Sequence, residues 1–221
     1  MKRDVALGCD CGLFKGVVQN VSNKSQHRGI CYCDDCQAYA VYLGKEKAVL
    51  DSHGGTDIFH TTPSNVKFTQ GADLVRGLHL TAKGPHRWFT SCCKTPIANT
   101  STNARLPHVG LMHTIWKPEK DGLSKDEVFG PVAIRAMGKF AIGKPPAGTA
   151  DTLSLKSFFT ILRFFAISIL KRRHVPSAFF AGDGKPRAPV EEVSKAQREA
   201  LKPFTGPDRE TKGDPALVLR T

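Results

Sequence analysis

The stretch C31YCDDCQ37 places three cysteines and two carboxylates within seven residues. Cysteines two or three residues apart on a tight loop can reach one metal ion, and the CxCxxC spacing offers three thiolates while one position of a tetrahedral zinc ion is left to be filled. An open position is typical of a zinc ion that meets a substrate or a water molecule. Three interpretations stay open here: a structural zinc loop closed by a ligand from elsewhere, an accessible zinc ion, and a redox-active or empty thiol cluster.

Two further cysteine clusters favour metal binding over disulfides. The stretch C9DCG12 and the adjacent pair Cys92 and Cys93 bring the total to seven cysteines, an odd number that fits a disulfide framework poorly. The first residues contain no apolar run that resembles a signal peptide, which predicts a cytoplasmic protein, and disulfides are rare in that compartment. We therefore predict that the cysteine clusters bind Zn²⁺ as a cofactor.

The composition is that of a globular protein with a basic surplus. Lys and Arg number 32 against 20 Asp and Glu, which gives a formal net charge of +12, and 40% of the residues are hydrophobic. The surplus favours acidic partners, such as nucleic acid, anionic lipid or small anions, and identifies none of them. The densest basic run, K171RRH174, is too short for a nucleic-acid-binding arm, and we find no specific nucleic-acid motif.

Residues 1–145 have the pattern of a mainly β domain. Short apolar or alternating runs recur at intervals of about ten residues and are separated by Gly, Pro, Asn and Asp. The runs that predict strands are 5–9, 16–21, 40–44, 57–63, 66–71, 76–82 and 86–90. We predict small antiparallel sheets that carry the zinc-binding loops, and we place the end of this domain at the Pro- and Gly-rich stretch 143–151.

Residues 146–221 have the pattern of a helical extension with a basic tail. Apolar residues recur at helical spacing within 153–173, at positions 155, 158, 159, 162, 165, 166, 169 and 170. Asp151 or Thr152 is the expected N-cap of this helix. Because the apolar run is short and has Arg163 at its middle, we predict no transmembrane segment.

Two interpretations of the predicted helix 153–173 stay open. It packs on the sheet, or it is an interfacial or oligomer-forming helix. A second, short helix is predicted over residues 189–201.

The ordered cysteine motifs resemble those of the glutathione-dependent formaldehyde-activating enzyme and centromere protein V family. The resemblance covers about residues 5–100 and is carried by C9DCG12, C31YCDDCQ37, F59HTT62 and G84PHRWFTSCCKTPI97. It implies a β-tent, which is a fold of stacked antiparallel sheets with zinc at its loops. It also implies a structural zinc ion at Cys9, Cys11 and Cys93, and an open one at Cys31, Cys33 and Cys36 near a glutathione or thiol site.

The third motif departs from the family pattern. Where the family has Phe-Cys-x-x-Cys-Gly, this chain has Thr90 in place of the first cysteine and Lys94 in place of the glycine. Cys92 stands near the missing ligand, but adjacent cysteines point apart in an extended chain. If the turn is tight, Cys92 and Cys93 join Cys9 and Cys11 in one site, which is the arrangement we predict. Otherwise the two cysteines serve different ions, or one of them is a free thiol.

Two functions are compatible with these motifs. The first is a zinc-dependent enzyme, similar to a carbon–sulfur lyase, that acts on a glutathione or other thiol adduct of a small aldehyde. Its catalytic centre is predicted at Cys31, Cys33 and Cys36, and Arg87 is predicted to bind a carboxylate of the thiol. His27 is the first candidate among the histidines for a further ligand. The alternative is a non-catalytic, zinc-stabilised binding module whose metal is purely structural.

Overall fold

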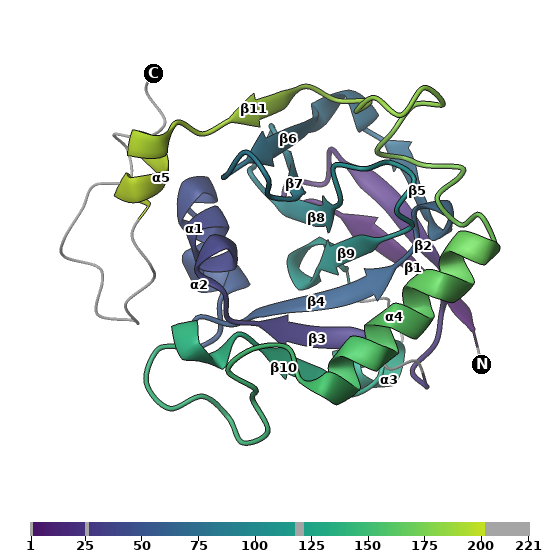
Figure 1. Ribbon diagram of the computed structural model, residues 1–221. Coiled ribbons are helices and arrows are strands. Elements are labelled where there is room, and N and C mark those ends of the chain that lie inside the picture. Colours follow the sequence, from purple (N-terminus) through teal and green to yellow (C-terminus); the bar gives the residue numbers. More distant parts are fainter. Residues whose placement is uncertain (1, 25–26, 118–121, 202–221) are drawn as a thin grey trace.

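The computed structural model describes residues 2–24, 27–117 and 122–201. Its strands form two sheets, so the predicted mainly β fold is confirmed (Figure 1). The smaller sheet is antiparallel, in the order β1-β2-β5, and contains β1 (Arg3–Gly8), β2 (Lys15–Val21) and β5 (Val66–Gln70).

The larger sheet has eight strands in the order β10-β3-β4-β9-β8-β7-β6-β11. Its six inner strands are antiparallel, and the two outer strands, β10 and β11, pair in parallel with their neighbours. In this order the strands are β10 (Ile134–Ala136), β3 (Arg28–Cys31), β4 (Thr56–Thr61), β9 (Val109–Met112), β8 (Pro96–Thr100), β7 (His86–Thr90), β6 (Val75–His79) and β11 (Val190–Glu192). The helices are α1 (Asp34–Leu43), α2 (Glu46–Val49), α3 (Lys125–Phe129), α4 (Leu155–Leu170) and α5 (Lys195–Ala200).

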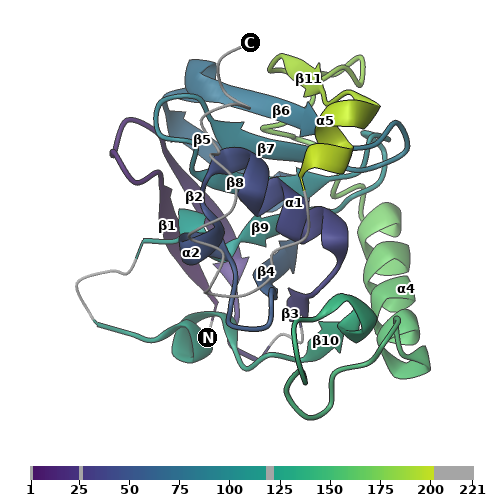
Figure 2. The same ribbon diagram turned by 90° about the vertical axis from the view of Figure 1, so that its left-hand side faces the viewer.

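The larger sheet is covered on both faces. Neighbouring side chains of a strand point to opposite faces, so β7 contributes to two cores. Trp88 packs in the core between the two sheets, whereas Phe89 packs in a second core beneath α1, which lies across the sheet in Figure 2. Both aromatic side chains are almost fully buried. Because both faces are covered, every residue of β7, β8 and β9 is buried, and buried positions do not alternate with exposed ones.

The prediction of a strand at residues 40–44 is wrong, because this segment is the end of α1. The helix begins after Cys33 and carries two carboxylates in its first turn, where the positive end of the helix dipole stabilises them. It ends at Gly44, which has φ +63° and donates its N–H to carbonyl groups of the last turn. A short apolar run fits a buried helix as well as a strand, so these terminal signals decide between the two.

The predicted helix within 153–173 is confirmed as α4, with a different N-cap. Ser154 caps α4 by accepting a hydrogen bond from the backbone N–H of Ser157, so neither Asp151 nor Thr152 takes that role. The face of α4 toward the protein carries Thr160, Ile161, Phe164, Phe165 and Ser168, which are buried or half-buried.

Most of the apolar face predicted from the sequence is exposed. The exposed fractions are 72% for Leu155, 49% for Phe158, 58% for Phe159, 51% for Leu162, 53% for Ile169 and 84% for Leu170. Helix α4 is apolar on more than one face, so its sequence pattern did not distinguish the packed face from the exposed one. Among the helices of the described residues, none has the length and hydropathy needed to span a lipid bilayer.

The segment after α4 completes the larger sheet. Phe179 and Phe180 are buried, and both rings pack against Trp88. Beyond them, β11 pairs with β6, so the helix predicted over 189–201 is confirmed only at its end, as α5. The division of the chain near residue 145 stays a prediction, and strands from both sides of it share one sheet.

Candidate metal centres

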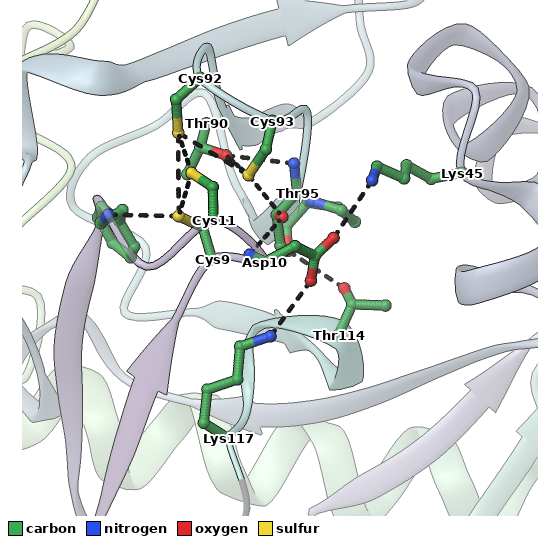
Figure 3. Close-up of polar contacts among 12 residues, drawn as sticks. Cys9, Asp10, Cys11, Lys45, Thr90, Cys92, Cys93, Thr95, Thr114 and Lys117 are labelled. Carbon is green, nitrogen blue, oxygen red and sulfur yellow. Dashed lines mark hydrogen bonds and ion pairs between the residues drawn. The ribbon is translucent and has the colours of Figure 1, made fainter.

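The first cysteine cluster joins two turns that are far apart in the sequence. Cys9 and Cys11 lie in the turn between β1 and β2, and Cys92 and Cys93 lie in the turn between β7 and β8 (Figure 3). The four Sγ atoms all lie within 4.8 Å of one another. The structure therefore brings together the four cysteines that we predicted to form one site.

The sulfur–sulfur distances in this cluster match a tetrahedral metal site. They are 3.4 Å from Cys9 to Cys11, 3.8 Å from Cys9 to Cys92, 3.4 Å from Cys11 to Cys92 and 3.8 Å from Cys92 to Cys93. Four sulfurs at roughly 2.3 Å from a zinc ion stand about 3.8 Å apart, whereas a disulfide joins its sulfurs at about 2.05 Å. The cysteines are free thiols, so the arrangement fits metal binding.

A tight turn allows the two adjacent cysteines to face the same point. Thr90 accepts a hydrogen bond from the N–H of Lys94 at 2.9 Å and donates its own N–H to the carbonyl of Thr95 at 3.0 Å. Lys94 has φ +57°, in the left-handed region that glycine adopts most easily. This geometry explains why a glycine suits the position, and here the Lys94 ammonium lies over the Phe89 ring, 5.0 Å from its centroid.

Two sulfurs of this cluster have hydrogen-bond partners outside the cysteines. The backbone N–H of Phe14 donates to Cys9 Sγ at 3.2 Å. Thr90 Oγ1 and Thr95 Oγ1 lie 3.5 and 3.1 Å from Cys93 Sγ. Partial burial raises the pKa of Cys93, but the hydrogen bonds with the two threonines outweigh it and lower the pKa to about 5. Thr90 thus supports a ligand instead of being one.

Two lysines form ion pairs with the aspartate of the same cluster. Asp10 lies between Cys9 and Cys11, and its carboxylate binds Lys45 and Lys117, each at 3.2 Å (Figure 3). The backbone N–H of Asp10 donates to Thr95 Oγ1 at 3.1 Å, which ties the two cysteine turns together. Four thiolates around Zn²⁺ carry a net charge of −2, which nearby ammonium groups stabilise.

The second cluster lies where β3 leads into α1. Cys31 ends β3, Cys33 is the N-cap of α1, and Cys36 is in the first turn of that helix. Their Sγ atoms lie within 4.8 Å of one another. In the part of the chain that the structure describes, no histidine or carboxylate joins these three sulfurs in a common group. His27 lies instead against Phe164, with 5.2 Å between the ring centroids.

A buried cation accompanies the second cluster. Arg87 is only 3% exposed, and its Nη1 lies 3.8 Å from Cys36 Sγ and 3.4 Å from Asn99 Oδ1. Hydrogen bonds from Cys31 and Cys33, followed by the Arg87 charge, lower the pKa of Cys36 well below its ordinary value. Three thiolates on Zn²⁺ carry a net charge of −1, which one guanidinium neutralises. The sequence did not predict this contact, and substrate binding by Arg87 stays a prediction.

The last residue of CYCDDCQ holds the loop in place. The buried Gln37 donates hydrogen bonds from Nε2 to the carbonyls of Tyr32 and Phe140, both at 2.9 Å. Gly54 packs against this amide, where a Cβ atom would come within 3.0 Å of it. Gln37 therefore links the metal-binding loop to a segment about a hundred residues later, and position 54 requires glycine.

The two carboxylates of CYCDDCQ also have a partner that the sequence does not indicate. Arg198 of α5 binds Asp35 at 2.6 Å and Asp34 at 3.5 Å. These ion pairs place the end of the described chain against the first turn of α1. Nothing in the local sequence of either segment predicts a contact across 163 positions.

The fold and the two clusters define a mainly β protein with two groups of cysteines that can each hold a metal ion. The chain belongs to DUF6151, a family of unknown function whose model matches residues 1–191. The match extends through α4 and into β11, so these elements are part of the family's common sequence. No curated protein matches the chain.

Proposed function

We propose that this protein binds two zinc ions and that the ion at Cys31, Cys33 and Cys36 accepts a small thiol as its fourth ligand. The observation that carries the proposal is the difference between the clusters, since one gathers four sulfurs and the other three. A filled tetrahedral site is typical of structural zinc, and three protein ligands are typical of zinc that binds a substrate or water. The first centre then stabilises the fold and the second provides the function.

We further propose that the chain is a divergent relative of the formaldehyde-activating enzyme and centromere protein V family, with a β-tent fold. Two features support this proposal. The cysteine motifs occur in the order described above, and the first and third motifs meet in space as the family pattern implies. A cytoplasmic location belongs to the same proposal, because both clusters consist of reduced thiols.

The reaction we propose is the reversible addition of a thiol to a small aldehyde, as in a glutathione adduct. A bound zinc ion supplies Lewis acidity and lowers the pKa of a thiol that binds it. In the lyase direction the C–S bond of the hydroxyalkyl thioether breaks, the hydroxyl group loses its proton as the carbonyl forms, and the sulfur leaves as the thiolate. Cys31, Cys33 and Cys36 would hold the ion, and Arg87 would balance its charge.

Metal analysis of matched variants tests this proposal. We expect two zinc ions per chain in the natural protein and one in each of Cys9→Ser and Cys33→Ser. Because structural zinc contributes folding free energy directly, Cys9→Ser should lower the melting temperature strongly. Cys33→Ser should keep the fold but lose the thiol-dependent change in the visible spectrum of the Co²⁺-substituted protein.

Two results would contradict the proposal. If the natural protein holds one zinc ion per chain, the Cys31 cluster is not a metal centre. If it holds two ions but glutathione and simple thiols leave the Co²⁺ spectrum unchanged, the second ion is structural and the protein fits the non-catalytic binding module.

A further inference from the structure

A cavity of about 390 Å³ lies between α4 and the larger sheet. Small-molecule sites typically have volumes of roughly 300–1,000 Å³. One side of the cavity is formed by β3, β4 and β10, including Cys31. Thr160, Ile161, Phe164 and Phe165 of α4 form the other side. Because Cys31 contributes to both the cavity lining and the second cysteine cluster, a ligand of that centre can extend into the cavity.

The lining of the cavity is almost free of charge. None of the described residues that line it is Asp, Glu, Lys or Arg. Its main polar group is the pair His60 and His108, in which Nδ1 of one ring lies 2.9 Å from Nε2 of the other. Burial and the neighbouring ring lower the pKa of His60 to about 3, and burial lowers that of His108 to about 4, so both are neutral at pH 7.

We propose that this cavity is the substrate pocket of the Cys31 centre and that it takes the apolar part of a hydrophobic thiol or thiol adduct. The inference rests on the proposed function and narrows its substrate class. Glutathione carries two carboxylates and an ammonium group, and the cavity offers no charged partner to any of them. An alkyl or aryl chain would bury apolar surface against Ile134, Ile161 and Phe164.

A series of thiols of increasing length tests this inference. Propane-1-thiol, hexane-1-thiol and glutathione are titrated into the protein loaded with Co²⁺, with the visible spectrum as the readout. Each buried methylene contributes about 0.8 kcal/mol, so affinity should rise roughly fourfold per methylene, or about 60-fold from propyl to hexyl. Ile161→Trp fills the cavity and should remove this gain while propane-1-thiol still binds. Leu162→Trp, on the exposed side of α4, is the matched control.

The outcomes separate this inference from the proposed function. Equal affinities for the two alkyl thiols would contradict the proposed pocket, and so would an increase in affinity with chain length that persists in Ile161→Trp. Neither result would contradict thiol binding at the Cys31 centre. Tighter binding of glutathione than of hexane-1-thiol would overturn the pocket as well. If no thiol changes the spectrum, the proposed function itself fails and the pocket with it.

A second inference comes from the outer face of α4, independently of the cysteines. Figure 2 shows α4 at the margin of the molecule, and six of its large apolar side chains are about half or more exposed. Basic residues accompany this face: Arg163 on the helix, and Lys171 and Arg172 directly after it. Residues 152–182 contain no Asp or Glu. A helix that exposes large apolar side chains beside basic residues is suited to the surface of a membrane.

We infer that α4 binds the surface of an anionic lipid bilayer. The charge favours this partner over a second copy of the chain, because two chains of net charge +12 repel each other. The exposed side chains of Phe158, Phe159 and Leu162 would enter the acyl boundary, and the basic residues would attract the anionic headgroups. The helix lies on the membrane in this arrangement and does not cross it.

Vesicle sedimentation tests this second inference with the full chain. We expect binding to vesicles that contain phosphatidylserine and at least tenfold weaker binding to phosphatidylcholine alone. The double variant Phe158→Ser with Phe159→Ser should lose the binding, and Lys171→Gln with Arg172→Gln should weaken it at least tenfold. Equal binding to both lipids would overturn the inference. A dimer that the Phe158 and Phe159 substitutions dissociate, without lipid binding, would assign this face to a second copy instead.

Discussion

At the scale of single residues, Arg87 places a buried positive charge beside the three cysteines of the proposed second metal centre. The guanidinium is buried beside Cys36, and its charge matches that of three thiolates on a divalent ion. We predict that Arg87→Met, which keeps much of the side chain's length without its charge, lowers zinc affinity at the Cys31 centre by about 10- to 100-fold. Competition with a chelator measures this effect.

The same titration contains its own controls. The four-sulfur centre at Cys9 lies in other turns and should keep its affinity in Arg87→Met. The exposed Arg105 provides a matched substitution, Arg105→Met, that should change neither centre. Equal loss at both centres would mean that Arg87 acts through the fold and not through its charge.

The buried histidine pair predicts a loss of stability in mild acid. The pKa of His108 is lowered from 6.5 to about 4, so the unfolded chain binds a proton below pH 6.5 that the folded chain does not. The free energy of unfolding therefore falls as the pH decreases from about 6.5 toward 4. Between pH 7 and pH 5 we expect His108 to account for a loss of roughly 2 kcal/mol.

Urea unfolding at the two pH values measures this loss. The cysteine centres also bind protons in acid, so the natural protein is compared with His108→Gln, in which those centres are unchanged. The variant should lose less stability over the same pH interval. Identical losses would show that the histidine pair is not kept neutral by the fold.

At the scale of secondary structure, one face of α4 packs against the protein and another is exposed. Phe164 is half-buried against His27, and Phe159 is 58% exposed. We predict that Phe164→Ala lowers the free energy of unfolding by roughly 1–3 kcal/mol, and that Phe159→Ala changes it by less than about 0.5 kcal/mol. Thermal unfolding without lipid compares the two, and the reverse order would contradict the orientation of the helix.

Much of the local structure could be predicted from the sequence, because it depends on side-chain patterns within single segments. The strand 86–90 and the helix within 153–173 are dictated by their own side-chain patterns. The spacing within C9DCG12 and C31YCDDCQ37 similarly indicated two cysteine clusters, because cysteines so close in sequence can reach one ion.

The errors came from contacts between distant segments. The run 40–44 is apolar because α1 packs on the sheet, and a short apolar run does not distinguish a helix from a strand. The exposed face of α4 could not be recognised because the protein meets the other face through Ile161 and Phe164. Arg198 and Arg87 approach the second cluster from positions far along the chain, and no spacing rule relates them to it.

At the scale of the whole molecule, the segment after residue 145 contributes to the sheet, the core and the proposed pocket. It provides α4, which forms one side of the cavity, and β11, which pairs with β6. It also provides Phe179 and Phe180, which are 1% and 5% exposed. Burying each of these side chains contributes roughly 1.5–3 kcal/mol. The total free energy of unfolding of a protein of this size is only about 5–15 kcal/mol. Losing the burial of both side chains would therefore remove a large fraction of the stability.

We therefore predict that a chain truncated after residue 145 does not fold stably, although it retains all seven cysteines. Removing β11 leaves β6 as an open edge, and removing Phe179 and Phe180 exposes Trp88. Circular dichroism with urea should show no cooperative transition, whereas a chain ending at residue 201 should unfold cooperatively. The double variant Phe179→Ser with Phe180→Ser in the full chain should lose roughly 3–6 kcal/mol by the same reasoning. A cooperative, zinc-loaded fragment 1–145 would instead establish the β-rich part as a domain that folds by itself.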